Sequence, residues 1–285
     1  MILGKSDDHG TLKKRGQVVN LDDIARRNQA FWKKMASDSG REANRYTRPW
    51  PDLEVSLLKA FIRGDVDVLP EPYTYIYPPS VLAGVRDKDV LCLSASGGQQ
   101  SVVFGLLGAR VTVFDLTGEQ LETARDMARH HGYEVKTIQG DMRDLSGLKA
   151  GAYDLVYQAV SVCFVPDLRE VYRQVARVVK PGGTYRVEHC HPATHTVEED
   201  SWDGKGYRIE DSYAPGRVED PDTVEFRHLF SDIFNGLVEC GFVIRGVWDD
   251  PRHLRDTDGE KPGTYDHVLG FVAKHFAIAA EKPGG

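Results

Sequence analysis

Three short runs in the middle of the chain contain residues that could bind a ligand. Residues 94–98 (Ser94, Ala95, Ser96, Gly97 and Gly98) form a turn of small side chains, which lets the backbone approach a ligand closely. Asp115 follows 17 residues after Gly98, and its carboxylate could accept hydrogen bonds from both hydroxyls of a ribose. In the third run, Gly140-Asp141-Met142, the aspartate could accept from an adenine amino group while the methionine packs on the ring. Each run also has a purely structural interpretation, but their order and spacing together favour a ligand site.

Strands alternate with helices from residue 87 onward, and this alternation would position the three runs. The predicted strands are the mostly apolar segments 90–94, 110–115, 134–141, 153–160 and 184–190, and the predicted helices between them are 99–108, 118–132 and 167–183. This pattern is typical of a parallel sheet covered by helices on both faces. A helix at 226–241 and strands at 242–249 and 264–276 would close the sheet with a hairpin. Since ligands bind at the carboxyl ends of parallel strands, we expect the three runs at one edge of the sheet.

The N-terminal third is aromatic and predicts a cap over that edge. Helices are expected at 21–37 and 52–63, followed by an extended segment at 69–80 that is rich in proline and tyrosine. No structure is assigned to the first 20 residues. We expect a cap at 1–80, a core at 81–276 with a polar inserted lid at about 191–225, and a tail at 277–285. The aromatic side chains of the cap are expected to help to enclose a pocket for a small, partly apolar molecule.

Composition excludes several classes of partner. The 285 residues carry a formal net charge of −7, so the basic surface of a nucleic-acid-binding protein is missing. No apolar stretch is long enough for a membrane span, and the N-terminus lacks the apolar segment of a secretory signal. We therefore expect a cytoplasmic protein, monomeric or homodimeric, that acts on a small molecule without binding nucleic acid or a membrane.

The cysteines and histidines predict no metal site. Cys92, Cys163, Cys190 and Cys240 lie far apart in sequence and form no Cys-x-x-Cys pair, which fits a reduced protein without disulfides. The run 189–195 contains three histidines and a cysteine, but alternation along a strand would point neighbouring side chains to opposite faces. The sequence therefore gives no reason to expect a metal ion.

The motifs of the chain resemble those of the class I S-adenosylmethionine-dependent methyltransferases. The resemblance covers about residues 81–276 and rests on VLCLSASGG, VTVFDLTGEQL, GDMRDL, YDLVYQAVSVCFVPDL and VVKPGGTYRV. It implies an α/β, Rossmann-like fold: a seven-stranded, mostly parallel sheet with its last strand antiparallel and helices on both faces, here with an N-terminal helical cap. It also implies S-adenosylmethionine as cofactor and S-adenosylhomocysteine as product.

The resemblance also implies roles for individual residues. Residues 94–98 would lie against the methionine part of the cofactor, and Asp115 would hold the ribose hydroxyls, with Leu116 next to the adenine. Asp141 and Met142 would contact the adenine. Gln158 would approach the methionine end through its backbone, and Tyr46 or Arg45 would close over that end.

Two departures from the family pattern occur in the first motif. Cys92 replaces the usual acidic residue of the first strand, and Ser94 and Ser96 replace the first two glycines of the loop. A serine is compatible with the loop if its φ is negative, so cofactor binding is expected to be retained, in a form that the serines could alter. The cysteine and the trailing Gly-Gly-Gln-Gln resemble a trait of a bacterial subgroup of this family.

These features together predict methyl transfer to an O, N or S atom of a small molecule by in-line displacement. A base is needed only if the acceptor loses a proton, and His191 and His228 are the candidates. Tyr75, Ser161 and Cys163 are expected in the substrate pocket. Two alternatives stay open at this point: an enzyme that uses the same cofactor for other chemistry, and a non-catalytic binding or regulatory module on the same fold.

Overall fold

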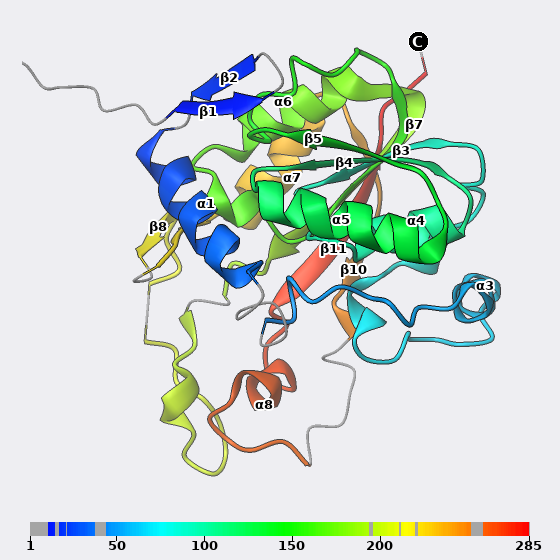
Figure 1. Cartoon of the computed structure of the whole chain (residues 1–285). Coiled ribbons are helices and arrows are strands. Elements are labelled where there is room, and N and C mark those ends of the chain that lie inside the picture. The colour runs from blue at the N-terminus through cyan, green and yellow to red at the C-terminus, as the bar shows by residue number, and fades with distance from the viewer. Residues whose placement is uncertain are drawn as a thin grey trace, which may run out of the picture.

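A seven-stranded sheet lies at the centre of the computed structural model (Figure 1). Its strand order is β10-β11-β7-β6-β3-β4-β5. The strands from β7 to β5 pair in parallel, whereas β11 is antiparallel to both β7 and β10. Their bounds are β3 Asp89–Leu93, β4 Arg110–Asp115, β5 Val135–Gln139, β6 Tyr153–Gln158, β7 Val179–Cys190, β10 Val243–Asp249 and β11 His275–Glu281. The predicted α/β, Rossmann-like sheet with an antiparallel last strand is confirmed.

The described part of the chain comprises residues 11–14, 17–20, 22–37, 44–193, 196–210, 212–219, 222–251 and 259–284. The sequence-based interpretation of the polar region 191–225 and of the first 20 residues falls partly outside these ranges. Within them, β1 (Thr11–Lys14) pairs with β2 (Gln17–Asn20), and β8 (Gly216–Glu219) pairs with β9 (Val224–Arg227). No helix of the described ranges combines the length and apolar character needed to cross a membrane.

Helices cover both faces of the sheet. The helices are α4 (Gln100–Leu106), α5 (Gly118–His131), α6 (Leu168–Val178) and α7 (Phe230–Glu239). Side chains of α4 and α5 share one core cluster with Val90 and Cys92 of β3, and those of α6 and α7 share the other with Leu91 and Leu93. Successive residues of a strand point to opposite faces, so these four apolar positions of β3 serve both clusters. This is why the parallel strands show no polar alternation.

The N-terminal segment packs on the core rather than forming a core of its own. It contains α1 (Asp23–Met35), α3 (Val55–Arg63) and two 3₁₀ turns, η1 (Tyr73–Tyr75) and η2 (Pro79–Val81), in the segment expected to be extended. Trp50 and Phe61 are buried in the same cluster as Val90 and Val102. Asp22 begins α1 by accepting a hydrogen bond from the Ala25 amide at 2.9 Å, so the helix starts later than the sequence predicted.

The C-terminal region corrects two predictions. The expected strand at 264–276 is mostly not a strand, because α8 (Tyr265–Leu269) begins at the helix cap Thr264. The last strand starts only at His275, and the expected boundary between core and tail at 276/277 therefore lies inside β11. This strand is rich in alanine and buried along most of its length, so it shows neither the alternation nor the side chains that usually mark a strand.

Candidate active site

A cavity of about 390 Å³ opens at the carboxyl ends of the parallel strands. Its walls include Ser94 after β3, Asp115 at the end of β4, Ala159 after β6 and Cys190 at the end of β7. Helix α1 and the segments around residues 44–46, 223–225 and 265 complete the enclosure. The volume is in the range of pockets that bind small molecules.

The structure brings many of the predicted site residues to this cavity, but not all of them. Those that line it are Tyr46, Tyr75, Ser94, Ser96, Asp115, Leu116, Met142, Ser161 and Cys163. The predicted residues that do not line it are Arg45, Ala95, Gly97, Gly98, Asp141, Gln158, His191 and His228. Residues at the ends of four different strands therefore meet at one site. Several of the residues next to them in the sequence lie behind the cavity wall.

The carboxylate of Asp115 is oriented so that it can accept hydrogen bonds from the hydroxyls of a ligand. Its Oδ1 accepts hydrogen bonds from the backbone amide and the hydroxyl of Thr117, both at 2.9 Å. Burial raises the pKa of Asp115 to about 6, against the hydrogen bonds of Thr117, which lower it. A carboxylate with further acceptor capacity at the wall of a cavity fits the two hydroxyl donors of a ribose. The acceptor oxygens of Asp115 therefore fit the ribose of S-adenosylmethionine.

The loop after β3 adopts an unusual backbone conformation. Ser94 and Ser96 have φ values of 47° and 45°, and Gly98 has 76°. The condition of a negative φ at the two serines is not met: they keep the left-handed conformation that favours glycine. Gly97 is required for a different reason, since its amide donates to Gln120 Oε1 at 2.7 Å and a Cβ there would lie 2.6 Å from Thr123 Cβ. The turn is thereby held tightly against α5.

We expect Ser96→Gly to stabilise the protein or leave its stability unchanged. In the left-handed conformation, a serine costs about 1 kcal/mol of stability that a glycine does not. Glycine in turn loses more chain entropy on folding, and this loss cancels part or all of the gain. The free energy of unfolding should therefore rise by up to about 1 kcal/mol in a denaturant titration. Ser56→Gly in the exposed part of α3 is the control and should lower it by about 0.5 kcal/mol. Equal destabilisation by both substitutions would contradict the strain.

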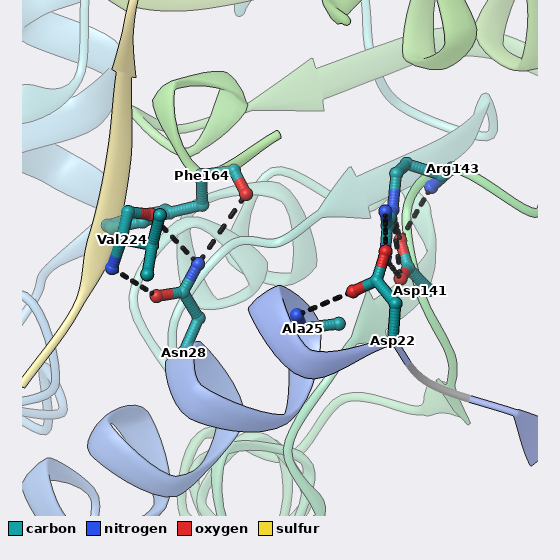
Figure 2. A network of polar contacts seen from close by, with 7 residues as sticks. All are labelled: Asp22, Ala25, Asn28, Asp141, Arg143, Phe164 and Val224. Atoms are coloured by element: carbon teal, nitrogen blue, oxygen red, sulfur yellow. Dashed lines mark hydrogen bonds and ion pairs between the residues drawn. The ribbon is translucent and has the colours of Figure 1, made fainter. Parts of the chain in front are cut away.

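Asp141 anchors α1 instead of lining the cavity. Its carboxylate accepts from Arg143 Nε at 3.1 Å to each oxygen, and Arg143 also reaches Asp22 Oδ2 at 2.6 Å (Figure 2). The hydrogen bond from Arg143 is the main cause that lowers the pKa of Asp22. Met142, the next residue, does line the cavity. The predicted adenine contact of Asp141 therefore finds no support in its position, whereas that of Met142 does.

Asn28 fixes the middle of α1 over the cavity. Its Nδ2 donates to the carbonyl oxygens of Val224 at 3.0 Å and Phe164 at 3.5 Å, and its Oδ1 accepts from the Val224 amide at 2.8 Å (Figure 2). The side chain is buried and also lines the cavity. On the next position of α1, Gln29 Nε2 donates to the Leu116 carbonyl at 2.8 Å. Helix α1 is thus part of the wall of the site.

We expect Asn28→Ala to weaken the attachment of α1 to the rest of the site. The substitution removes the bonds to Val224 and Phe164 and leaves buried backbone groups with one partner fewer, which should lower the free energy of unfolding by about 2–3 kcal/mol. Cofactor affinity, measured by titration calorimetry, should fall with it. Asn235→Ala on the exposed side of α7 is the control and should change stability by less than about 0.5 kcal/mol. Unchanged stability and affinity in Asn28→Ala would show that α1 is not held in this way.

His191 and His228 lie outside the main cavity and line a separate one of about 10 Å³. His228 Nε2 is 3.0 Å from the Val165 carbonyl oxygen, and burial lowers the pKa of this histidine. His191 Nδ1 accepts from the Ala193 amide at 3.1 Å, and its ring packs on Phe230. Both rings are held by local contacts, so their predicted role as base receives no support from the geometry.

Gln158 also lies behind the cavity wall. Its side chain donates to Ser161 Oγ at 2.9 Å and accepts from the Tyr185 hydroxyl at 2.5 Å. Its carbonyl oxygen accepts from Arg186 at 3.2 Å. The residues at the end of β6 that line the cavity are Ala159 and Val160, not Gln158.

The most informative residue that the sequence interpretation missed is Glu188 in β7. It lines the cavity, is only 2% exposed, and receives a hydrogen bond from Arg186 Nη1 to Oε2 at 3.1 Å. Its other oxygen, Oε1, is buried and has no hydrogen-bond partner among the described residues. A signal existed in the sequence, because TYRVEHC places Arg186, Glu188 and Cys190 on one face of a strand otherwise surrounded by apolar residues.

Arg186 is itself completely buried and held on several sides. Its Nε donates to the Tyr77 carbonyl at 3.0 Å, and its guanidinium lies 4.7 Å from the ring centre of Tyr77 and 4.5 Å from that of Tyr157. A buried guanidinium in such a setting keeps its charge and orients the carboxylate beside it. Arg186 therefore holds Glu188 in one orientation at the cavity wall.

Other residues that line the cavity were also missed. They are Phe31, Trp32, Phe164, Cys190, Glu225, Tyr265 and His275. His275 Nδ1 lies 3.5 Å from Asp250 Oδ2. Burial lowers the pKa of His275, but its hydrogen bonds to Asp250 and Cys190 prevail and raise it to about 9. Sequence reasoning could not find this group, since its members come from α1, the 3₁₀ turn η3 (Val162–Phe164), β7, β9, α8 and β11.

Comparisons with known proteins agree with this geometry. Residues 91–187 match a family model described as a methyltransferase domain. A ubiquinone biosynthesis O-methyltransferase of Cronobacter sakazakii is 37% identical over 198 residues, which cover 63% of this chain and 78% of that protein. An uncharacterized methyltransferase of Bacillus subtilis, YbaJ, is 26% identical over 210 residues, 70% of this chain and 82% of its own length.

A solved structure shows the same fold. The S-adenosylmethionine-dependent methyltransferase of Mesorhizobium loti superposes with a TM-score of 0.59 at 20% identity, covering 71% of this chain and 94% of the other. The strand order, the cavity at the carboxyl edge and the match of sequence therefore lead to one conclusion. The chain belongs to the class I S-adenosylmethionine-dependent methyltransferases, and S-adenosylmethionine is its cofactor.

Proposed function

We propose that this enzyme methylates an O, N or S atom of a small molecule that donates a hydrogen bond to Glu188. The observation that carries the proposal is Glu188 Oε1, a buried carboxylate oxygen without a partner among the described residues, in the wall of the cavity that also contains Asp115. A buried carboxylate oxygen left without a donor is unfavourable, so a ligand with an O–H, N–H or S–H group would satisfy it. The limited volume supports a small acceptor.

The cofactor end of the cavity would be held by the residues described above. S-adenosylmethionine, when bound, supplies a methyl group on a sulfonium centre. Asp115 would accept from the ribose hydroxyls, Leu116 and Met142 would contact the adenine, and the turn with Ser94 and Ser96 would lie against the methionine part. Tyr46, which lines the cavity from the N-terminal segment, would close over that part. The enclosure would align the two reactants and exclude water.

The acceptor end of the cavity, where we place Glu188, Glu225 and the rings of Trp32, Tyr75 and Tyr265, favours a neutral or cationic substrate. Glu188 and Glu225 contribute carboxylates, and no lysine or arginine occurs among the described residues that line the cavity. The positive charge that the raised pKa gives His275 is balanced by Asp250, which lies 3.5 Å from its Nδ1. The rings of Trp32, Tyr75 and Tyr265 provide apolar and π surfaces, which suit aromatic or cationic groups. Glu188 would orient the acceptor atom and take its proton when a hydroxyl or thiol is methylated. The name of the Cronobacter relative, an O-methyltransferase, supports a hydroxyl among these possibilities.

An acceptor screen tests the proposal. The protein is incubated with S-adenosylmethionine and matched sets of phenols, amines and thiols, each with a counterpart that carries a carboxylate or phosphate. Release of S-adenosylhomocysteine and methylated product is measured by mass spectrometry. We expect turnover on uncharged or cationic members and little on the anionic counterparts. Turnover confined to anionic acceptors, or binding of the cofactor without any methylated product, would contradict the proposal.

A further inference from the structure

We propose that Cys163, Cys190 and Glu225 form a binding site for a thiophilic divalent cation, Zn²⁺, at the acceptor end of the cavity. The two sulfur atoms and a carboxylate oxygen all lie within 4.8 Å of one another. Cys163 belongs to the 3₁₀ turn η3 (Val162–Phe164), Cys190 ends β7, and Glu225 lies in β9. Three separate elements therefore direct metal-ligating groups to a single point.

The ligand types favour zinc over other common cations. Two thiolates and a carboxylate are typical Zn²⁺ ligands, whereas Mg²⁺ and Ca²⁺ prefer oxygen alone. In a tetrahedral zinc site, bonds of about 2.0–2.3 Å place neighbouring ligand atoms about 3.3–3.8 Å apart. The observed spread of up to 4.8 Å needs only small side-chain movements to reach this geometry. Both cysteines are free thiols, and they are hydrogen-bonded to each other.

The surroundings resemble the outer shell of a metal site. His275 is hydrogen-bonded to Cys190 through their side chains, and its Nδ1 faces Asp250 at 3.5 Å. Asp250 is fully buried, so it holds the imidazole in one orientation. A hydrogen bond to a coordinating sulfur, oriented in turn by a carboxylate, is the arrangement that positions and tunes metal ligands. His275 would thus support the site as a positioning residue.

All three ligands line the large cavity, so a bound ion would have one coordination position that faces the cavity. Sites with three protein ligands and one open position are those at which zinc binds a reacting molecule and lowers the pKa of a bound O–H or S–H group. Metal binding itself does not depend on the proposed function. Its consequence for an acceptor does rest on that function: the acceptor atom would bind the ion and its proton would pass to Glu188.

Metal content and spectroscopy test the site. The full chain is stripped with a chelator under a thiol-free reductant, loaded with Zn²⁺, passed over a desalting column and analysed for zinc. Loading with Co²⁺ in its place should give an intense thiolate-to-cobalt charge-transfer band and tetrahedral d–d bands. We expect a single tightly held ion in the wild type and a loss of affinity of at least about tenfold in Cys163→Ser, Cys190→Ser and Glu225→Gln.

Cys240→Ser is the matched control, because Cys240 lies at the end of α7 and outside the cavity. It should hold the ion as the wild type does, and circular dichroism of every variant checks that the fold is intact. Absence of zinc and of thiolate–cobalt bands in folded wild type, or metal retained equally in both cavity cysteine variants, would overturn the site. Methyl transfer measured on the same samples separates the two ideas: turnover by a protein that binds no metal overturns only the metal site, and metal binding without turnover on any acceptor overturns only the proposed function.

Discussion

Asp115→Ala is expected to weaken S-adenosylmethionine binding by at least about 100-fold. Two hydrogen bonds from ribose hydroxyls to an ionised carboxylate contribute about 1.5–3 kcal/mol each, and each 1.4 kcal/mol corresponds to a tenfold change in Kd. The carboxylate is buried and its Oδ1 is oriented by Thr117, so no other side chain replaces it easily. Titration calorimetry with S-adenosylmethionine and S-adenosylhomocysteine measures the effect.

The control for this variant is Asp65→Ala, which removes an exposed ion pair with Arg63 and should leave cofactor affinity unchanged. Asp115→Asn should lie between the wild type and Asp115→Ala, because the amide keeps one acceptor oxygen but loses the charge. Micromolar binding that survives in Asp115→Ala would remove Asp115 from the site.

The pKa of Asp115 adds a dependence on pH. Because burial raises this pKa to about 6, the carboxyl is ionised at pH 7 and becomes protonated as the pH falls below about 6. Cofactor affinity should therefore decline below pH 6, and binding near pH 6 should release protons, seen as a buffer-dependent heat.

The stability of the cofactor-free protein should depend on pH in the opposite way to cofactor affinity. The folded state binds the Asp115 proton more tightly than the unfolded state, so this group lowers stability as the pH rises from about 4 to about 6. In Asp115→Asn both effects should disappear.

Glu188 is expected to give the second large effect, and its two substitutions should separate stability from activity. Glu188→Ala leaves the Arg186 guanidinium buried without its carboxylate, and loss of one partner of a buried ion pair costs about 3–5 kcal/mol. Glu188→Gln keeps an oxygen that can accept from Arg186 Nη1, so it should unfold much less readily than Glu188→Ala. It should still lower kcat at least about 100-fold on the acceptor found in the screen, since the amide cannot take a proton.

Cofactor affinity should stay within about threefold of the wild type in Glu188→Gln, because the role proposed for Glu188 concerns the acceptor and not the cofactor. Glu239→Gln is the control: it breaks the exposed pair with Arg169 and should change stability by less than about 1 kcal/mol and activity not at all. Undiminished kcat in folded Glu188→Gln would exclude Glu188 from proton transfer. A Glu188→Ala variant as stable as the wild type would show that Arg186 does not need this partner.

Much of the fold could be predicted from local patterns. The apolar runs that became β3, β4 and β6 and the amphipathic stripes of α5 and α6 follow from side-chain periodicity alone. Residues directly after those strands, such as Ser94 and Asp115, were placed at the site because parallel strands share one carboxyl edge. β11 escaped prediction because an alanine-rich strand buried on both faces has no periodic signature, and α8 was mistaken for strand because short apolar runs suit both.

Local sequence patterns were enough to predict the parallel strands, the helices between them and the edge of the sheet that carries the site, because each depends on residues within a few positions of one another. The tertiary structure alone decided which conformation Ser94 and Ser96 adopt, since the close packing of their neighbours Gly97 and Gly98 against α5 fixes the turn. It also decided that Asp141 binds Arg143 and that Glu188, Cys163, Cys190 and Glu225 meet in one cavity. Asp141 and Arg143 are close in sequence, but the residues that meet in the cavity come from β7, β9 and the η3 turn, and only the packing of these elements brings them together.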